Sequence, residues 1–143
     1  MRRLLPAFTL LLALGAACGA PKPTDIPGPE SPWKEMSQEQ RKVYMATTVL
    51  PHMSETFQAH DAERYAEFDC ETCHVTGAAR GDYAMPDPGI PALSRWKFRS
   101  EHWKKHPETV QFMWEQVKPE MSALLGGPKG QRGFGCASCH TRR

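Results

Sequence analysis

Two copies of the pentapeptide C-x-x-C-H constrain this chain more than any other feature of its sequence. CETCH occupies residues 70–74 and CASCH occupies residues 136–140. In an exported chain this motif is typical of covalent haem attachment: the two thiols each form a thioether to a vinyl group, and the adjacent histidine points at the iron. The predicted cofactor is haem c, bound twice. The predicted attachment residues are Cys70, Cys73, Cys136 and Cys139, and the predicted proximal iron ligands are His74 and His140.

Other uses of paired cysteines fit this sequence less well. A zinc ribbon places its two C-x-x-C pairs about 15 to 20 residues apart, whereas 62 residues separate Cys73 from Cys136. A zinc ribbon also leaves the two histidines unexplained. A thioredoxin-like redox pair needs a βαβ pattern around it, and the sequence shows almost no strand signal. Haem attachment is therefore the favoured interpretation.

The first 18 residues have the features of an export signal. Two arginines precede a leucine-rich run of about a dozen residues, which is too short to span a membrane. Residues 14–18, LGAAC, resemble a bacterial lipobox, in which Cys18 becomes lipidated; cleavage by ordinary signal peptidase is the alternative. Residues 19–32 are rich in proline and predict an extended tether before a domain at 33–143. We expect a bacterial periplasmic lipoprotein whose membrane contact is the lipid on Cys18.

The charge of the chain argues against nucleic acid as a partner. The formal net charge is +2, from 18 basic and 16 acidic residues. Arg2 and Arg3 belong to the export signal, so the remaining chain has 16 of each. Phosphate binding needs a concentrated positive field, which a nearly neutral chain lacks.

The predicted domain has too few apolar residues for an ordinary core. Residues 33–143 contain four Leu, one Ile, five Val and five Phe, below the roughly 20% that marks a strongly charged chain as disordered. This chain carries almost no net charge and has helical periodicity instead. Small scaffolds of this kind depend on disulfides, metals or cofactors. Two porphyrins would supply the missing apolar surface.

An internal repeat precedes the two motifs. A shift of 68 residues aligns YMATTVLPHMSETF (44–57) with FMWEQVKPEMSALL (112–125). Apolar residues recur at steps of three and four in both copies, so each copy is predicted to be a helix. Ser37 with Gln40 forms a capping box for the first helix, Pro107 suits the opening turn of the second, and residues 126–128 end it. Pro51 and Pro119 are expected to bend or break these helices.

These patterns predict an all-α domain with two helix-plus-CxxCH repeats. The sequence resembles a small dihaem member of the multihaem c-type cytochromes, on the strength of CETCH and CASCH. The order of a methionine-bearing helix followed by C-x-x-C-H is similar to the haem-binding segments of the cytochrome subunit of photosynthetic reaction centres. No methionine follows His140, so the second haem must take its other axial ligand from upstream. The repeat nominates Met121 for that haem and Met53 for the first.

The sequence also allows other residues as axial ligands. Met45 and Met113 are equally repeated and lie two turns before the nominated pair. Met85, in YAMPDPGIP, resembles the Met-Pro ligand loop of single-haem cytochromes. A stripe of methionines at helical spacing is more often core than ligand. The histidines without a repeated counterpart are His52, His60, His102 and His106.

Charges are distributed unequally around the two motifs. Acidic residues crowd the first motif between positions 61 and 71, whereas basic and aromatic residues alternate between positions 95 and 105 and basic residues flank the second motif. Solvated helix faces are the usual explanation of such runs. The sharper hypothesis is that the first haem has the lower potential and passes electrons to the second. The basic segment either docks an acidic redox partner or packs as an amphipathic helix.

The sequence as a whole predicts an electron-transfer protein that relays electrons between periplasmic or membrane redox proteins. In such a protein the haem carries the chemistry, and its ligands, burial and nearby charges set its potential. The alternative is a small haem enzyme of the peroxidase or nitrogen-oxide reductase type with one open iron site. No acid–base constellation lies beside either motif in the sequence, so no catalytic residue is predicted.

Overall fold

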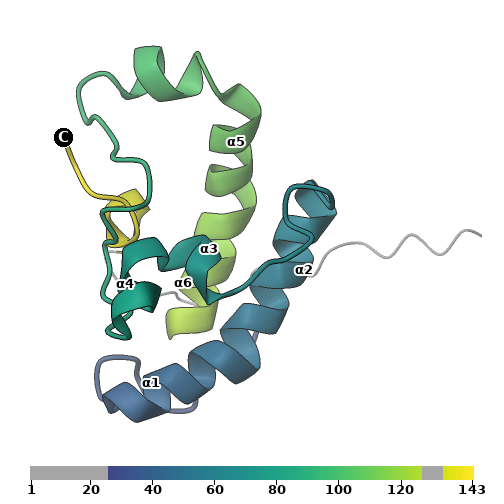
Figure 1. Cartoon of the computed structure of the whole chain (residues 1–143), viewed down its shortest axis with the longest axis vertical. Coiled ribbons are helices and arrows are strands. Elements are labelled where there is room, and N and C mark those ends of the chain that lie inside the picture. The colour runs from purple at the N-terminus through teal and green to yellow at the C-terminus, as the bar shows by residue number, and fades with distance from the viewer. Residues whose placement is uncertain (1–25, 127–133) are drawn as a thin grey trace, which may run out of the picture.

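The computed structural model describes residues 26–126 and 134–143, and this part of the chain is mostly helical (Figure 1). The described residues form no strand; their only β-type pairing is two isolated parallel bridges, Asp87 with His140 and Leu93 with Arg142. The expectation of an all-α fold is therefore confirmed at the level of secondary structure. No helix in the described part of the chain is long and apolar enough to cross a membrane. The predicted export signal and Cys18 lie outside the described residues.

The first helical unit runs without a break from Gln38 to His60. It consists of α1 (Gln38–Tyr44), the π-helical segment η2 (Met45–Val49) and α2 (Leu50–His60). The predicted capping box is confirmed: the backbone N–H of Gln40 donates to Ser37 Oγ at 3.2 Å, and the backbone N–H of Ser37 donates to Gln40 Oε1 at 2.8 Å. Two of the unpaired donors at the start of the helix are thereby satisfied.

The second helical unit repeats this order of segments. It consists of α5 (Pro107–Phe112), the π-helical segment η4 (Met113–Val117) and α6 (Lys118–Gly126). Pro107 occupies the opening turn, as the sequence predicted. Gly126 is the last described residue of this unit, and Gly127 and Pro128 lie outside the described residues, so the predicted end of the helix stays a prediction.

The two π-helical segments explain how a helix passes through each proline. A proline crowds the carbonyl four residues before it and offers no N–H. Widening the preceding turn by one residue relieves this conflict, and the N–H groups of Leu50 and Lys118 accordingly donate to carbonyls five residues back, on Met45 and Met113. Of the two expected outcomes, a bend or a break, the structure therefore excludes the break at both prolines. The wide turns are 68 residues apart, as are the two copies of the sequence pattern.

The two helical units pack against each other through equivalent positions. His52 aligns with Glu120 in the repeat, and His52 Nε2 lies 3.1 Å from Glu120 Oε2. Tyr44 donates from its hydroxyl to the carbonyl of Leu124 at 2.7 Å, while Phe112, the counterpart of Tyr44, packs on Phe57 with ring centroids 5.0 Å apart. The first residue of each copy thus contacts the end of the other copy, and the aligned residues His52 and Glu120 contact each other between them.

Short helices and one long connection complete the chain. The first motif forms α3 (Cys70–Cys73), which is followed by α4 (Val75–Arg80). A largely irregular stretch leads to the π-helical segment η3 (Phe98–Trp103), and the second motif begins with the 3-10 turn η5 (Cys136–Ser138). Asp69 caps α3 by accepting from the backbone N–H groups of Glu71 and Thr72, so one member of the acidic run has a structural role.

The core lies between the two helical units and is small. Its buried members are Ile26, Val49, Met53, Phe57, Phe112, Ala123 and Leu124. Phe57 is its centre, because the rings of Tyr65, Phe68 and Phe112 all lie within 5.0 Å of it, centroid to centroid. Ile26 was expected in the extended tether, but its side chain is buried in this core. Packing of the domain therefore begins upstream of residue 33.

Replacing Phe112 by alanine should destabilise the protein by about 3–5 kcal/mol, the usual cost of removing a buried aromatic ring. Phe112 is 3% exposed, and its ring also stacks on the ring of His60, with the two ring centroids 3.9 Å apart. Trp96, at 87% exposed, is the matched control, and Trp96→Ala should change stability by less than about 0.5 kcal/mol. Urea denaturation of the purified protein measures both. Equal losses in the two variants would contradict this account of the core.

Candidate haem-binding site

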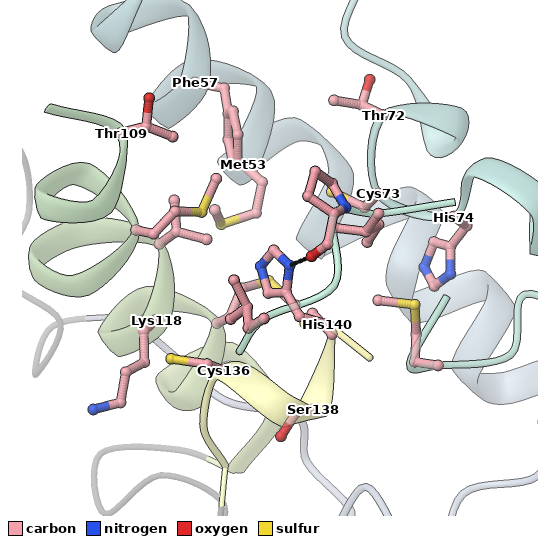
Figure 2. Close-up of a pocket in the computed structure, with 18 of the residues that line it drawn as sticks. Met53, Phe57, Thr72, Cys73, His74, Thr109, Lys118, Cys136, Ser138 and His140 are labelled. Carbon is pink, nitrogen blue, oxygen red and sulfur yellow. Dashed lines mark hydrogen bonds between the residues drawn. The ribbon is translucent and has the colours of Figure 1, made fainter. Parts of the chain in front are cut away.

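One cavity of about 1130 Å³ lies between the helical units and the two motifs. Its volume exceeds the roughly 300–1,000 Å³ typical of a site for one small molecule. Figure 2 shows Met53 from the first helical unit, Cys73 and His74 from the first motif, and Cys136 and His140 from the second around this space. The cysteines, histidines and methionines that line it are Met45, Met53, Cys70, Cys73, His74, Met85, His102, His106, Met113, Met121, Cys136, Cys139 and His140. All eight residues predicted for haem binding are therefore brought to one cavity.

Backbone hydrogen bonds hold the second motif against the stretch that follows the first. Asp87 N–H donates to the carbonyl of Cys139 at 3.3 Å, and Leu93 N–H donates to that of Thr141 at 2.9 Å. Arg143 N–H returns a bond to the carbonyl of Leu93 at 3.2 Å. Residues 87–93 therefore lie against the second motif and form part of the structure around it.

His140 is oriented as a metal-binding histidine requires. Its Nδ1 lies 3.0 Å from the carbonyl oxygen of Pro91. A carbonyl only accepts, so Nδ1 carries the proton and Nε2 keeps its lone pair. Histidines that bind metals almost always donate their other ring N–H to a carboxylate, carbonyl or water in this way. The side chain therefore fits the role of a proximal haem ligand.

His74 is the most unusual polar group in the described part of the chain. Its Nδ1 is buried and has no hydrogen-bond partner. Burial lowers the pKa of His74, against the opposing influence of the Asp87 carboxylate, so the neutral imidazole is favoured. A buried ring nitrogen without a protein partner is uncommon, and it calls for a ligand or another explanation. The ring packs edge to face on Tyr83, with centroids 5.6 Å apart.

Both motifs place a partly buried thiol in the cavity wall. Burial raises the pKa of Cys73 to about 12, and Cys139 of the other motif is the second cause of that shift. Burial likewise raises the pKa of Cys139 to about 11. Both side chains are therefore neutral thiols at neutral pH, set in the cavity wall. Cys70 and Cys136 are exposed at its edge.

Asp87 is a buried acid that sequence analysis missed. Its carboxylate accepts from the backbone N–H and hydroxyl of Thr76 and from the backbone N–H groups of Gly77 and Gly89. Burial alone would raise its pKa, but these hydrogen bonds outweigh burial and hold the pKa at about 2. The backbone N–H of Asp87 also donates to the carbonyl of Cys139, so Asp87 joins the start of α4 to the second motif. The sequence signal is Asp-Pro-Gly, in which an aspartate bonds the N–H two residues on.

Asp87→Asn should lower the stability of the protein most near neutral pH. The folded pKa of Asp87 lies below its ordinary value of 3.8, so its carboxylate contributes stability that is complete above pH 3.8 and is lost as the pH falls towards 2. The variant and the parent protein should therefore converge in acid. Urea midpoints measured from pH 7 to pH 2 check this. Asp82→Asn, at an exposed ion pair with Arg80, is the control and should shift them little.

The structure does not decide which methionines would be the axial haem ligands. Met45, Met85 and Met113 line the cavity together with Met53 and Met121. Met53 is also part of the core and is 3% exposed. The methionines therefore remain a set of five, of which the repeat supplies two pairs, Met53 with Met121 and Met45 with Met113.

The rival histidines fall into two groups. His52 contacts Glu120, His60 stacks on Phe112, and neither lines the cavity. His102 and His106 do line it, but His102 Nε2 accepts the backbone N–H of Ser94 at 3.2 Å. This bond engages the lone pair that a metal would need. His106 is therefore the remaining rival among these four.

Comparison with known proteins gives no assignment: no family model, no curated protein and no solved structure matches this chain.

Proposed function

We propose that this chain is a dihaem c-type cytochrome that carries electrons between other redox proteins. The observation that supports this most strongly is the single cavity lined by both C-x-x-C-H motifs, with His140 held by Pro91 in the tautomer that leaves Nε2 for iron. Haem, when bound, supplies reversible one-electron chemistry at its iron. The location we propose is the bacterial periplasm, with a lipid on Cys18.

The residues present fit two haems. Cys70 and Cys73 would bind one macrocycle and Cys136 and Cys139 the other, with His74 and His140 as the proximal ligands. The two histidines differ in their surroundings: Nδ1 of His140 lies 3.0 Å from the carbonyl oxygen of Pro91, whereas the buried Nδ1 of His74 has no hydrogen-bond partner. Met53 and Met121 complete the proposed ligand set.

The chain's own side chains would keep water away from the irons. Val49, Leu50 and Phe57 from the first helical unit and Val117 and Leu125 from the second line the cavity. An apolar wall lowers the local dielectric and controls solvent access, which are two of the means by which a protein sets a haem potential. Both haems would occupy one cavity, so electrons would pass between them without crossing a separate domain.

Absorption spectra and iron content of protein matured in a host that attaches c-type haem test the proposal. We expect two irons per chain, haem that remains bound after denaturation, and spectra that change reversibly on reduction. A colourless preparation, or one that contains zinc in place of iron, would refute the proposed function.

Single replacement of Met53 or Met121 by alanine should open one iron site. The weak long-wavelength band that a methionine sulfur gives with ferric haem should fall by about half in each variant, and the reduced variants should bind carbon monoxide where the parent protein resists it. Met45→Ala and Met113→Ala are the matched controls, because they change the other repeated pair on the same cavity. A larger loss of the band in the controls would reassign the ligands. Binding of carbon monoxide by the parent protein would favour the enzyme alternative.

A further inference from the structure

Residues 95–105, called the basic segment below, carry five cations on an exposed stretch. These are Arg95, Lys97, Arg99, Lys104 and Lys105. The one acidic residue of the segment, Glu101, is already neutralised: its carboxylate lies 2.8 Å from Arg143 Nη2 and 3.9 Å from Lys97 Nζ. The remaining cations have no acidic partner among the described residues. The segment therefore presents a concentrated positive charge to solvent.

Two tryptophans lie among these cations. Trp96 is 87% exposed and Trp103 is 45% exposed. The guanidinium of Arg95 lies over the ring of Trp96, 5.3 Å from its centroid. Burial in the protein interior explains neither ring. Tryptophan and arginine are the residues most enriched in the energetic centres of protein interfaces, so the pair has the composition of a docking site.

The inner side of the basic segment forms part of the haem cavity. Phe98, Glu101 and His102 line that cavity. Arg143, three residues after His140, binds Glu101 and so ties the segment to the end of the second motif. In Figure 1 the C-terminus, just beyond the second motif, lies on the same side of the molecule as the irregular stretch that leads to η3. The segment thus forms part of the cavity wall and lies beside the end of the second motif.

We infer that the basic segment is the docking surface for an acidic electron-transfer protein, and that electrons cross the surface of this molecule beside the second motif. The inference rests on the proposed function and adds to it the site of exchange and the charge of the partner. Positive charge around an exposed aromatic pair steers an acidic partner to this place, and a small charged interface lets the partner leave again quickly.

A protein surface explains the segment better than a membrane does. A segment that lies in a membrane interface presents a continuous apolar face to the lipid. Here Phe98, one of the two large aromatic side chains of η3, lines the cavity, so that only Trp103 of η3 is left to contribute to such a face. Trp96 and Trp103 are separated by seven positions and by charged residues. Phosphatidylserine vesicles nevertheless belong in the test, because cations and tryptophan also occur at lipid surfaces.

The kinetic test uses two small oxidants of opposite charge. Ferricyanide, an anion, takes one electron from the reduced protein and becomes ferrocyanide; hexaammineruthenium(III), a cation, is reduced to the ruthenium(II) complex in the same way. We expect the rate with ferricyanide to fall as ionic strength rises. The double variant Arg99→Glu with Lys104→Glu should react with ferricyanide at least about tenfold more slowly at low salt, and this difference should vanish at high salt. The cationic oxidant should not show this loss.

The matched control carries the same change of charge elsewhere. Lys34 and Lys42 are exposed and do not line the cavity. Lys34→Glu with Lys42→Glu should leave the ferricyanide rate within about twofold of that of the parent protein. A loss as large as that in the basic-segment variant would show that net charge, and not this surface, sets the rate, and would overturn the inference.

Binding of an acidic polypeptide provides the second measurement. Poly-L-glutamate should bind the parent protein and inhibit ferricyanide reduction, and should do neither with Arg99→Glu and Lys104→Glu. Sedimentation of the parent protein with phosphatidylserine vesicles, abolished in the variant, would assign the surface to a membrane. Salt-sensitive self-association abolished in the variant would assign it to the acidic residues 61–71 of a second copy. Either result overturns the inference while the protein remains coloured and redox-active, whereas a colourless protein refutes the proposed function itself.

Discussion

Replacing Cys136 and Cys139 together by alanine is expected to leave one covalently bound haem per chain in place of two. Each thioether needs a cysteine sulfur, and the other motif has its own pair, so attachment at residues 70–74 should continue. Replacing Cys70 and Cys73 should give the complementary product. Protein mass after denaturation and iron per chain measure the outcome. Ala137→Ser changes a position of the second motif that forms no bond to haem, and it should retain both haems.

The two single-haem proteins also test the inequality of the sites. Exposed acidic residues surround the first motif, and the buried Asp87 carboxylate acts on His74. Negative charge stabilises oxidised iron, so the haem kept by the variant without Cys136 and Cys139 should titrate at the lower potential. Equal potentials would show that exposed charges are screened. Loss of both haems from either variant would contradict independent attachment.

A variant in which all four motif cysteines are alanine should lose its cooperative unfolding transition. At about 24 cal/mol per Å³, an empty space of about 1130 Å³ would cost on the order of 27 kcal/mol. That cost exceeds the roughly 5–15 kcal/mol by which folded proteins are stable. The cavity must therefore fill with water or collapse, and the few buried apolar residues cannot compensate.

Circular dichroism during heating measures this loss directly. The cysteine-free variant should keep part of its helical signal, melt over a broad range and bind the dye ANS, as loosely packed states do. The haem-loaded parent protein, measured in parallel, should melt in one sharp transition. A sharp transition at the same temperature in both would show that the haems do not complete the core.

The sequence predicted the helical units well because their signals are local. The capping box of Ser37 with Gln40 and the proline that opens α5 depend on residues within one turn, and both are confirmed. The wide turns at Met45 and Met113 were missed, since a proline signals a conflict without saying how the helix resolves it. The repeat was visible in the sequence, but periodicity alone could not show that the copies contact each other through His52 and Glu120.

The candidate site was predictable in its residues and not in its arrangement. The spacing of C-x-x-C-H identifies the cysteines and histidines whatever the fold around them. That both motifs share one cavity depends on the pairing of residues 87–93 with the chain end, which joins segments about 50 residues apart. Asp87 was missed for the same reason, because its hydrogen-bond partners on α4 are brought to it by the loop between them.

The contact of His52 with Glu120 has a consequence for how this protein can diverge. In a symmetric dimer of two separate chains, the residue on the axis meets a copy of itself, so a histidine there would face a histidine and a glutamate a glutamate. A single chain that carries both copies escapes this restriction and can place unlike, mutually attractive residues at the crossing. Substitutions at these two positions should therefore be correlated. Related chains with an acidic residue at position 52 should carry a basic residue at position 120.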